Sequence, residues 1–455
     1  MLAIVFTALA FGTVEVWAVA IFAIFLLVLV ALWAVKAIVD KRLALKIPVV
    51  SVPFAALVMC GIVQSVQITR GGEASLSLSL DAEATRAAAT MLFLLFISFI
   101  VASNFLVTND RLKLLATFLI VYGLSMAVFA IVQHMTWAGR LYWVRQVSVG
   151  GAGYGGPFVN RNHFAGYMEM LIPISVALAL TRAFGREMRL FCGFSAVMMG
   201  IAEIASLSRG GIISLAGGLM FISALAPWIR KPMPLESEMG FRREREKQRE
   251  LKKSSRWITS LISSPGLSVL LIAFAIVGGV FWVDAGGGIA ARVANDSLTG
   301  AAPTSRWGIW SDTVSMIQAH PVLGVGLGAY KTAYPLYGRG DGLLLVDYTH
   351  NDYLQLIADC GVVGGAIALA FLVILFRSVR RCVQATNAVS RAVALGCAGG
   401  MFAILIHSLF DFNLQIPSNA LLFLILLSVV SEVGSGNAGG EFGKEWSSTV
   451  ARPAL

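Results

Sequence analysis

Residues 305–365 read SRWGIWSDTVSMIQAHPVLGVGLGAYKTAYPLYGRGDGLLLVDYTHNDYLQLIADCGVVGG, and this stretch decides how the rest of the chain is interpreted. Most of it is polar and rich in turn-forming residues. From Tyr353 onward it becomes an apolar run that continues to residue 376. A run of about 20 apolar residues is what a helix needs to cross the hydrocarbon core of a membrane. The junction at His350 therefore marks where a polar loop meets a predicted membrane-spanning helix.

The composition of the whole chain agrees with this interpretation. Apolar residues make up 57% of the 455 residues and charged residues only 13%, whereas soluble domains carry roughly a quarter charged residues. Mean hydropathy is +0.79. Segments inside hydrocarbon must satisfy their backbone hydrogen bonds internally, which favours helices. The sequence thus predicts an all-α polytopic membrane protein and excludes a soluble enzyme.

Apolar runs long enough to be membrane spans recur along most of the chain. They predict about twelve transmembrane helices, of which the first is short: 1–12, 16–36, 47–66, 88–107, 113–135, 164–181, 190–207, 210–229, 264–284, 353–376, 392–410 and 416–433. The chain then divides into an N-terminal bundle (1–284), a large external loop with short helices (285–352), C-terminal membrane helices (353–433) and a glycine- and serine-rich tail (434–455). The tail has little to bury and is predicted to be disordered.

Basic residues gather after alternate spans, and this distribution predicts which face is cytoplasmic. The basic segments are 36–46, 111–113, 182–189, 230–258 and 377–391. If the spans alternate, all five lie on the cytoplasmic face, together with both termini. The net charge of +10 is then explained by topology, and we expect no nucleic-acid partner.

The external loop contains two patterns with structural meaning. Trp307, Trp310, Val314 and Ile317 follow helical spacing, which predicts an amphipathic helix lying on the membrane surface or on the bundle. The glycines of GVGLGAY (324–330) predict a flexible turn. A dinucleotide site is disfavoured because no strand precedes these glycines.

His350 is the residue best suited to proton transfer. Imidazole titrates near neutral pH and is the commonest general base. Asp347 and Asp352 lie nearby in the sequence and are candidates to orient it. The alternative interpretation is that His350 merely caps the helix that follows.

Three arginines are predicted to face the same side as the external loop. Arg161 lies beside Asn160 and His163 at the start of one span, Arg209 lies at the tight SLSRGG junction, and Arg306 begins the predicted surface helix. Guanidinium groups bind two phosphate oxygens at once, so the arginines together are suited to an anionic group. The alternative for each is an interfacial arginine whose charged end extends into water.

Other ionisable residues are given structural roles. His407 and Asp411 are interpreted as a structural hydrogen-bonded pair at the end of a span, with the rim of the same cavity as the alternative, and Asp359 as a buried carboxylate that needs a partner. No HExxH motif, Cys/His cluster or paired external carboxylates occur in the sequence, so no metal and no cofactor is expected.

Four motifs resemble the O-antigen ligase/polymerase superfamily: FGTVEVWA near the N-terminus, GPFVNRNHFAGYMEMLIPI, SLSRGG, and RWGIWSDTVSMIQAHPVLGVGLGAY followed by THNDYLQ. The resemblance implies a GT-C-like fold in the bacterial inner membrane with a periplasmic loop and active site. It implies transfer of a glycan from an undecaprenyl-diphosphate carrier to a glycan, lipid A core or protein acceptor.

The resemblance also implies residue roles. His350 would activate the acceptor hydroxyl, while Arg161, Arg209 and Arg306 would bind the donor diphosphate, with Asn160, His163 and Asn351 as further substrate ligands. The reaction would be metal-independent and inverting. The sequence leaves ligase, polymerase and protein glycosylation open, as well as a transporter of a small anion or solute and a non-catalytic scaffold.

Overall fold

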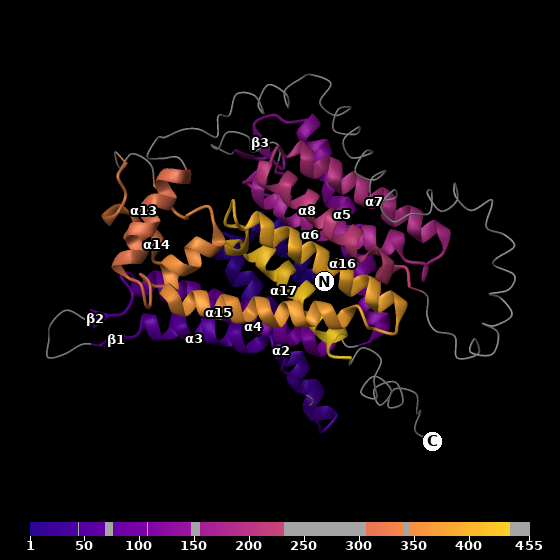
Figure 1. Ribbon diagram of the computed structural model, residues 1–455, viewed down its shortest axis with the longest axis horizontal. Coiled ribbons are helices and arrows are strands. Elements are labelled where there is room, and N and C mark those ends of the chain that lie inside the picture. Colours follow the sequence, from indigo (N-terminus) through magenta and orange to yellow (C-terminus); the bar gives the residue numbers. More distant parts are fainter. Residues whose placement is uncertain are drawn as a thin grey trace, which may run out of the picture.

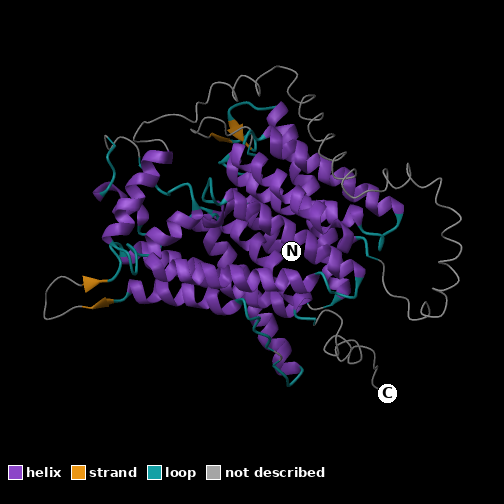
Figure 2. Ribbon diagram, viewed as in Figure 1, coloured by secondary structure: helices purple, strands orange, loops and turns teal. Residues whose placement is uncertain are grey.

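The computed structural model describes residues 1–43, 45–68, 76–106, 108–146, 155–231, 306–340 and 345–436. Apart from short loops, these residues form helices and two small antiparallel strand pairs, as Figure 2 shows. Nine of the described helices are long and apolar enough to cross a membrane: α2 (Val16–Val39), α4 (Ala82–Phe105), α5 (Asn109–Met135), α6 (Arg161–Leu180), α7 (Arg186–Ala205), α8 (Arg209–Ile229), α15 (Asp352–Cys382), α16 (Ala388–His407) and α17 (Pro417–Gly434).

The remaining described elements are short. They are helices α1 (Leu2–Leu9), α3 (Ser51–Ser65), α13 (Arg306–Ala319) and α14 (Tyr330–Ala333), the 3-10 turns Phe11–Thr13, Tyr334–Leu336 and Asn413–Gln415, and strands β1 (Gln67–Ile68), β2 (Leu76–Ser77), β3 (Arg140–Leu141) and β4 (Arg145–Gln146). Strand β1 pairs with β2, and β3 pairs with β4. Helices α13 and α14 lie at one end of the bundle (Figure 1).

The helical, polytopic prediction is confirmed. The count of twelve spans and the GT-C-like classification stay predictions. The predicted span 264–284, residues 232–258 of the basic loop and residues 437–455 of the tail lie outside the described residues.

Helices α6, α16 and α17 form the centre of the bundle, where almost every residue is buried. Glycines on α16 make this packing possible: a Cβ on Gly400 would overlap the Met170 carbonyl of α6, and one on Gly396 would lie 2.8 Å from the Ile174 Cα. In a membrane, close approach of backbones at small residues is a main source of helix association. The backbones of α6 and α16 therefore approach each other closely in the middle of the two helices.

Helix α15 is broken at Gly361, whose φ of 58° and ψ of −153° are accessible only to glycine. The loop after α13 fills the break. Pro321 O accepts from the Val362 N–H at 2.8 Å, and the Val325 N–H donates to Ala358 O at 2.9 Å. The backbone groups freed by the break are thus satisfied inside the protein, as burial requires.

The glycine-rich segment 324–328 is part of this junction and forms the predicted turn, while its flexibility stays a prediction. Gly326 and Gly328 have positive φ, and a Cβ on either would collide with Ser79 or Ala88. The same junction supplies the partners of buried Asp359, whose carboxylate accepts from the Gly328 N–H and the Gln355 side chain, both at 3.2 Å. Segment 324–328 is held by packing and hydrogen bonds.

Helix α13 packs on α15, but through a face that was not predicted. Its buried residues are Ile309, Asp312, Thr313 and Met316, whereas Trp307 is 69% exposed and Val314 45% exposed. The polar residues can be buried because the loop provides their partners: Asp312 accepts from the Tyr334 hydroxyl, and the Thr313 and Tyr330 hydroxyls are 2.8 Å apart. Trp307 and Val314 thus do not face the bundle, and the alternative that they lie on the membrane surface stays a prediction.

Gly361→Ala will destabilise the protein by at least about 2 kcal/mol, because the backbone conformation disfavours a side chain and the new Cβ would overlap the Val322 carbonyl. Gly365→Ala is the matched control on the same helix, since its Cβ would meet only Ile357, at 3.9 Å. Thermal unfolding of the two variants in one detergent makes the comparison. Equal melting temperatures would contradict the role given to the break.

Candidate functional site

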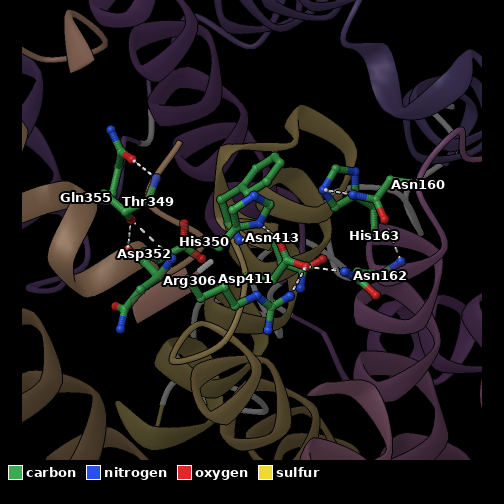
Figure 3. Close-up of polar contacts among 12 residues, drawn as sticks. Asn160, Asn162, His163, Arg306, Thr349, His350, Asp352, Gln355, Asp411 and Asn413 are labelled. Carbon is green, nitrogen blue, oxygen red and sulfur yellow. Dashed lines mark hydrogen bonds and ion pairs between the residues drawn. The ribbon is translucent and has the colours of Figure 1, made fainter. Parts of the chain in front are cut away.

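The carboxylate of Asp411 is the meeting point of four parts of the chain. Asp411 lies in the turn between α16 and α17, and its side chain is fully buried. His350 Nδ1 lies 3.3 Å from Oδ1, the Asn162 amide donates to Oδ2, and Arg306 Nη2 lies 3.8 Å from Oδ2. Figure 3 shows these three side chains directed toward the carboxylate. The loop histidine, the start of α6 and the start of α13 therefore converge on one negative charge.

His350 is held by its neighbours in the chain and does not cap α15. Its backbone adopts a positive φ of 53°. On one side, the Trp310 indole N–H donates to Thr349 O at 2.9 Å. On the other side, the Asn351 side chain is the actual cap of α15 and accepts from the Tyr353 N–H at 3.0 Å. The capping interpretation of His350 is therefore wrong, and its imidazole is directed to Asp411.

The turn that carries Asp411 is tied to the first residue of α15. The Asp352 carboxylate accepts from the Ser408 hydroxyl at 2.8 Å and from the Leu414 N–H at 3.2 Å. The Asp352 N–H in turn donates to Ser408 O at 2.8 Å. Because His350 lies two residues before Asp352, these bonds fix the histidine and the Asp411 turn relative to each other.

The start of α6 contributes a second set of polar groups. Asn160 caps the helix by accepting from the Asn162 N–H at 2.9 Å, and its amide nitrogen lies 3.3 Å from His163 Nε2. The ring of Phe412 lies 5.0 Å from both His163 and His350, measured between centroids. Arg161 is half-buried at the first position of α6. Of the predicted residues in this segment, Asn160 and His163 thus lie beside the Asp411 turn.

Arg209 begins α8, whose start packs against the end of α16. A Cβ on Gly210 would lie 2.7 Å from the His407 imidazole, so the two helix ends touch. His407 itself is paired with Glu169 of α6, with Nδ1 3.0 Å from Oε2. The Asp411 N–H donates to His407 O at 3.0 Å. Arg209 therefore lies at the same end of the bundle as Asp411.

The predicted side-chain pairing of His407 with Asp411 was wrong. Each has a different partner, Glu169 for His407 and His350 for Asp411. Asn162 was not predicted as a member of the site, and Asp411 was given a place at the cavity only as the alternative to a structural pair. The available signal was the spacing HSLFD (407–411), which leaves an aspartate in a turn one helical turn beyond a buried histidine.

The electrostatics of the site favour an ionised Asp411. Burial by itself raises the pKa of this carboxyl, but the hydrogen bond from His350 and the nearby charge of His163 outweigh it. The pKa is held well below its ordinary value. An ionised carboxylate only accepts hydrogen bonds, so His350 Nδ1 is the donor, and in a neutral imidazole the lone pair is then on Nε2. The arrangement can therefore accept a proton at Nε2.

Asn351 is already committed to structural bonds. Its carbonyl oxygen caps α15, and its amide donates to Leu409 O at 3.2 Å. Its role toward a substrate stays a prediction. Among the residues that the structure describes, no group of three or more His, Cys, Asp or Glu side chains is arranged to hold a metal ion.

Part of the chain that forms this site matches a known protein family. A family model described as O-Antigen ligase matches residues 194–369, a range that contains Arg209, Arg306 and His350. No curated protein matches the chain. The match supports a glycan-transferring role in general and does not favour the transporter alternative. The resemblance stated from the motifs is thereby confirmed over residues 194–369, the part of the chain that the O-antigen ligase family model matches.

Proposed function

We propose that this protein transfers a glycan from an undecaprenyl-diphosphate-linked donor to an acceptor hydroxyl at the periplasmic face of the bacterial inner membrane. It would act as an O-antigen ligase or as an O-antigen or exopolysaccharide polymerase. The observation that carries the proposal is the contact of His350 with buried Asp411 beside Arg306, in a chain matched by the O-antigen ligase family.

The proposed chemistry uses His350 as the general base. Asp411 accepts Nδ1–H and orients the ring, as a carboxylate does in hydrolase triads. Nε2 takes the proton of the acceptor hydroxyl while the oxygen attacks the anomeric carbon. The bond from that carbon to the diphosphate oxygen breaks, and the diphosphate leaves with the electron pair. Attack opposite the leaving group inverts the anomeric configuration.

Arginines supply the stabilisation that a metal would otherwise provide. Charge develops on the leaving diphosphate, and guanidinium groups bind its oxygens with paired hydrogen bonds. Arg306 suits this role because its side chain is 45% exposed and 3.8 Å from Asp411, so it is only loosely held. Arg161 and Arg209 are the further candidates at this end of the bundle.

His350→Ala will fold but lose glycan transfer by a factor of about 10² to 10⁴, the usual contribution of a general base. The measurement is turnover of lipid-linked oligosaccharide by purified protein in proteoliposomes. His320→Ala is the control, because His320 lies in the same loop and contacts Tyr337 away from Asp411. Full activity of His350→Ala would exclude the base role.

Asp411→Asn removes the charge that orients His350 while keeping the shape of the side chain. We expect transfer to fall by about 10² or more with the protein still inserted and monodisperse. Asp347→Asn is the matched control, since Asp347 is half-exposed in the same loop and pairs with Lys331. Equal activity of the two variants would mean that Asp411 serves stability alone.

Arg209→Lys keeps the charge but loses the planar fork of donors. If Arg209 binds the diphosphate, kcat/KM for the lipid-linked donor should fall roughly tenfold or more. Arg140→Lys, an exposed position on β3, should leave it unchanged. A normal kcat/KM for Arg209→Lys would assign Arg209 to anchoring the start of α8.

A further inference from the structure

A basic pocket lies at the end of α15 farthest from His350. It is lined by Arg377, Arg380, Arg381 and Gln384 and has a volume of about 310 Å³. Beyond the break at Gly361, α15 continues through residues 362–382 and extends roughly 31 Å at 1.5 Å per residue. This pocket is therefore separate from the candidate site and does not depend on the proposed function.

The three arginines in the pocket are exposed and concentrated. Among the described residues, none of their guanidinium groups forms a hydrogen bond or an ion pair. Three guanidinium groups on adjacent turns repel one another, and an anion between them would relieve that repulsion. The cluster is therefore suited to an anionic group.

The same face of α15 carries an unpartnered apolar stripe. Val362, Leu369, Val373 and Phe376 are between 41% and 65% exposed. They follow one another at spacings of seven, four and three residues, and Arg377 lies four residues after Val373. Such spacings place side chains on one face of a helix. The opposite face is occupied, because Cys382 donates to Val430 O of α17 and Leu375 is buried.

The dimensions of the stripe match one leaflet. From Leu369 to Arg377 the helix rises about 12 Å, close to half of the roughly 30 Å hydrocarbon thickness. An acyl chain lying on Leu369, Val373 and Phe376 therefore has its headgroup at the level of the arginines. Arginine binds phosphate oxygens in pairs, and basic pockets at this depth suit anionic lipid headgroups.

We propose that Arg377, Arg380 and Arg381 form a binding site for an anionic phospholipid, with the phosphate among the guanidinium groups and an acyl chain along Leu369–Phe376. The arginines favour an anionic headgroup, and the apolar stripe favours a lipid over a free anion. Free phosphate lacks the tail and should bind weakly.

Native mass spectrometry of the full-length protein in detergent tests the site. The probes are dioleoyl phosphatidylglycerol, dioleoyl phosphatidylcholine and inorganic phosphate. Wild-type protein should retain phosphatidylglycerol in preference to both others. Arg377→Gln/Arg381→Gln should weaken that binding about thirtyfold, from the usual attraction of two basic residues to an anionic lipid.

The matched control is Arg182→Gln/Arg186→Gln, which removes two exposed arginines between α6 and α7 and changes the net charge equally. It should retain phosphatidylglycerol. Equal affinity of the wild type for both phospholipids, or equal loss in both double variants, would overturn the site. Phosphate binding as tight as the lipid would overturn the role of the stripe. If the glutamine variant misfolds, Arg377→Lys/Arg381→Lys replaces it, and thermal stabilisation by phosphatidylglycerol is measured. Stabilisation equal to that by phosphatidylcholine would also overturn the site.

Discussion

The buried negative charge of Asp411 is the constraint on which the candidate site depends. A carboxylate removed from water is costly unless it is paired and hydrogen-bonded. Its compensation comes from His350, Asn162 and Arg306, which belong to three separate segments. The need to satisfy one charge thus draws the loop before α15, the start of α6 and the start of α13 to the turn between α16 and α17. Asp352 adds a second tie between that turn and α15.

The break in α15 makes this convergence rigid. A long loop would ordinarily leave His350 with many accessible positions. Here the segment around Gly324 and Gly326 inserts into the break at Gly361 and is bonded to Ala358 and Asp359. Loop and helix therefore form one unit, and the histidine enters the site from a fixed base. Preorganisation of this kind is what general base catalysis requires, because reacting atoms must be placed within a few tenths of an ångström.

Much of the fold was predictable, because long apolar runs have one physical solution in a membrane. Predicted span 164–181 corresponds to α6, Arg161–Leu180, and 353–376 to α15, Asp352–Cys382. Helix α15 ends later than predicted because its arginines continue the helix beyond the hydrocarbon, and a prediction from hydropathy does not include such charged residues. Boundaries set by apolar runs were thus predictable, whereas those set by caps and helix-forming polar residues were less so.

The candidate site was predictable in part, and the missing part has a physical reason. His350 and Arg306 were chosen from residue chemistry, and both contact Asp411. Asp411 lies 61 residues from His350 and 249 from Asn162, so no local pattern in one sequence connects them. The buried face of α13 was not predicted for the same reason. Asp312 on that face is bonded to Tyr334, which belongs to the 3-10 turn Tyr334–Leu336. Burial of polar groups depends on partners that only the fold brings together.

The bonds around Asp411 differ in strength, and the difference bears on the proposed function. Asn162 and His350 bond the carboxylate directly, whereas Arg306 lies at 3.8 Å with nearly half of its side chain exposed. At that distance, and with the arginine partly in water, solvent screens the attraction between the two groups. A diphosphate, which carries more charge and fits the guanidinium fork, would compete well for Arg306. When the arginine turns to the donor, Asp411 keeps its bonds with His350, Asn162 and the Phe412 N–H, and His350 keeps its orientation. Donor binding would therefore leave the proposed base undisturbed.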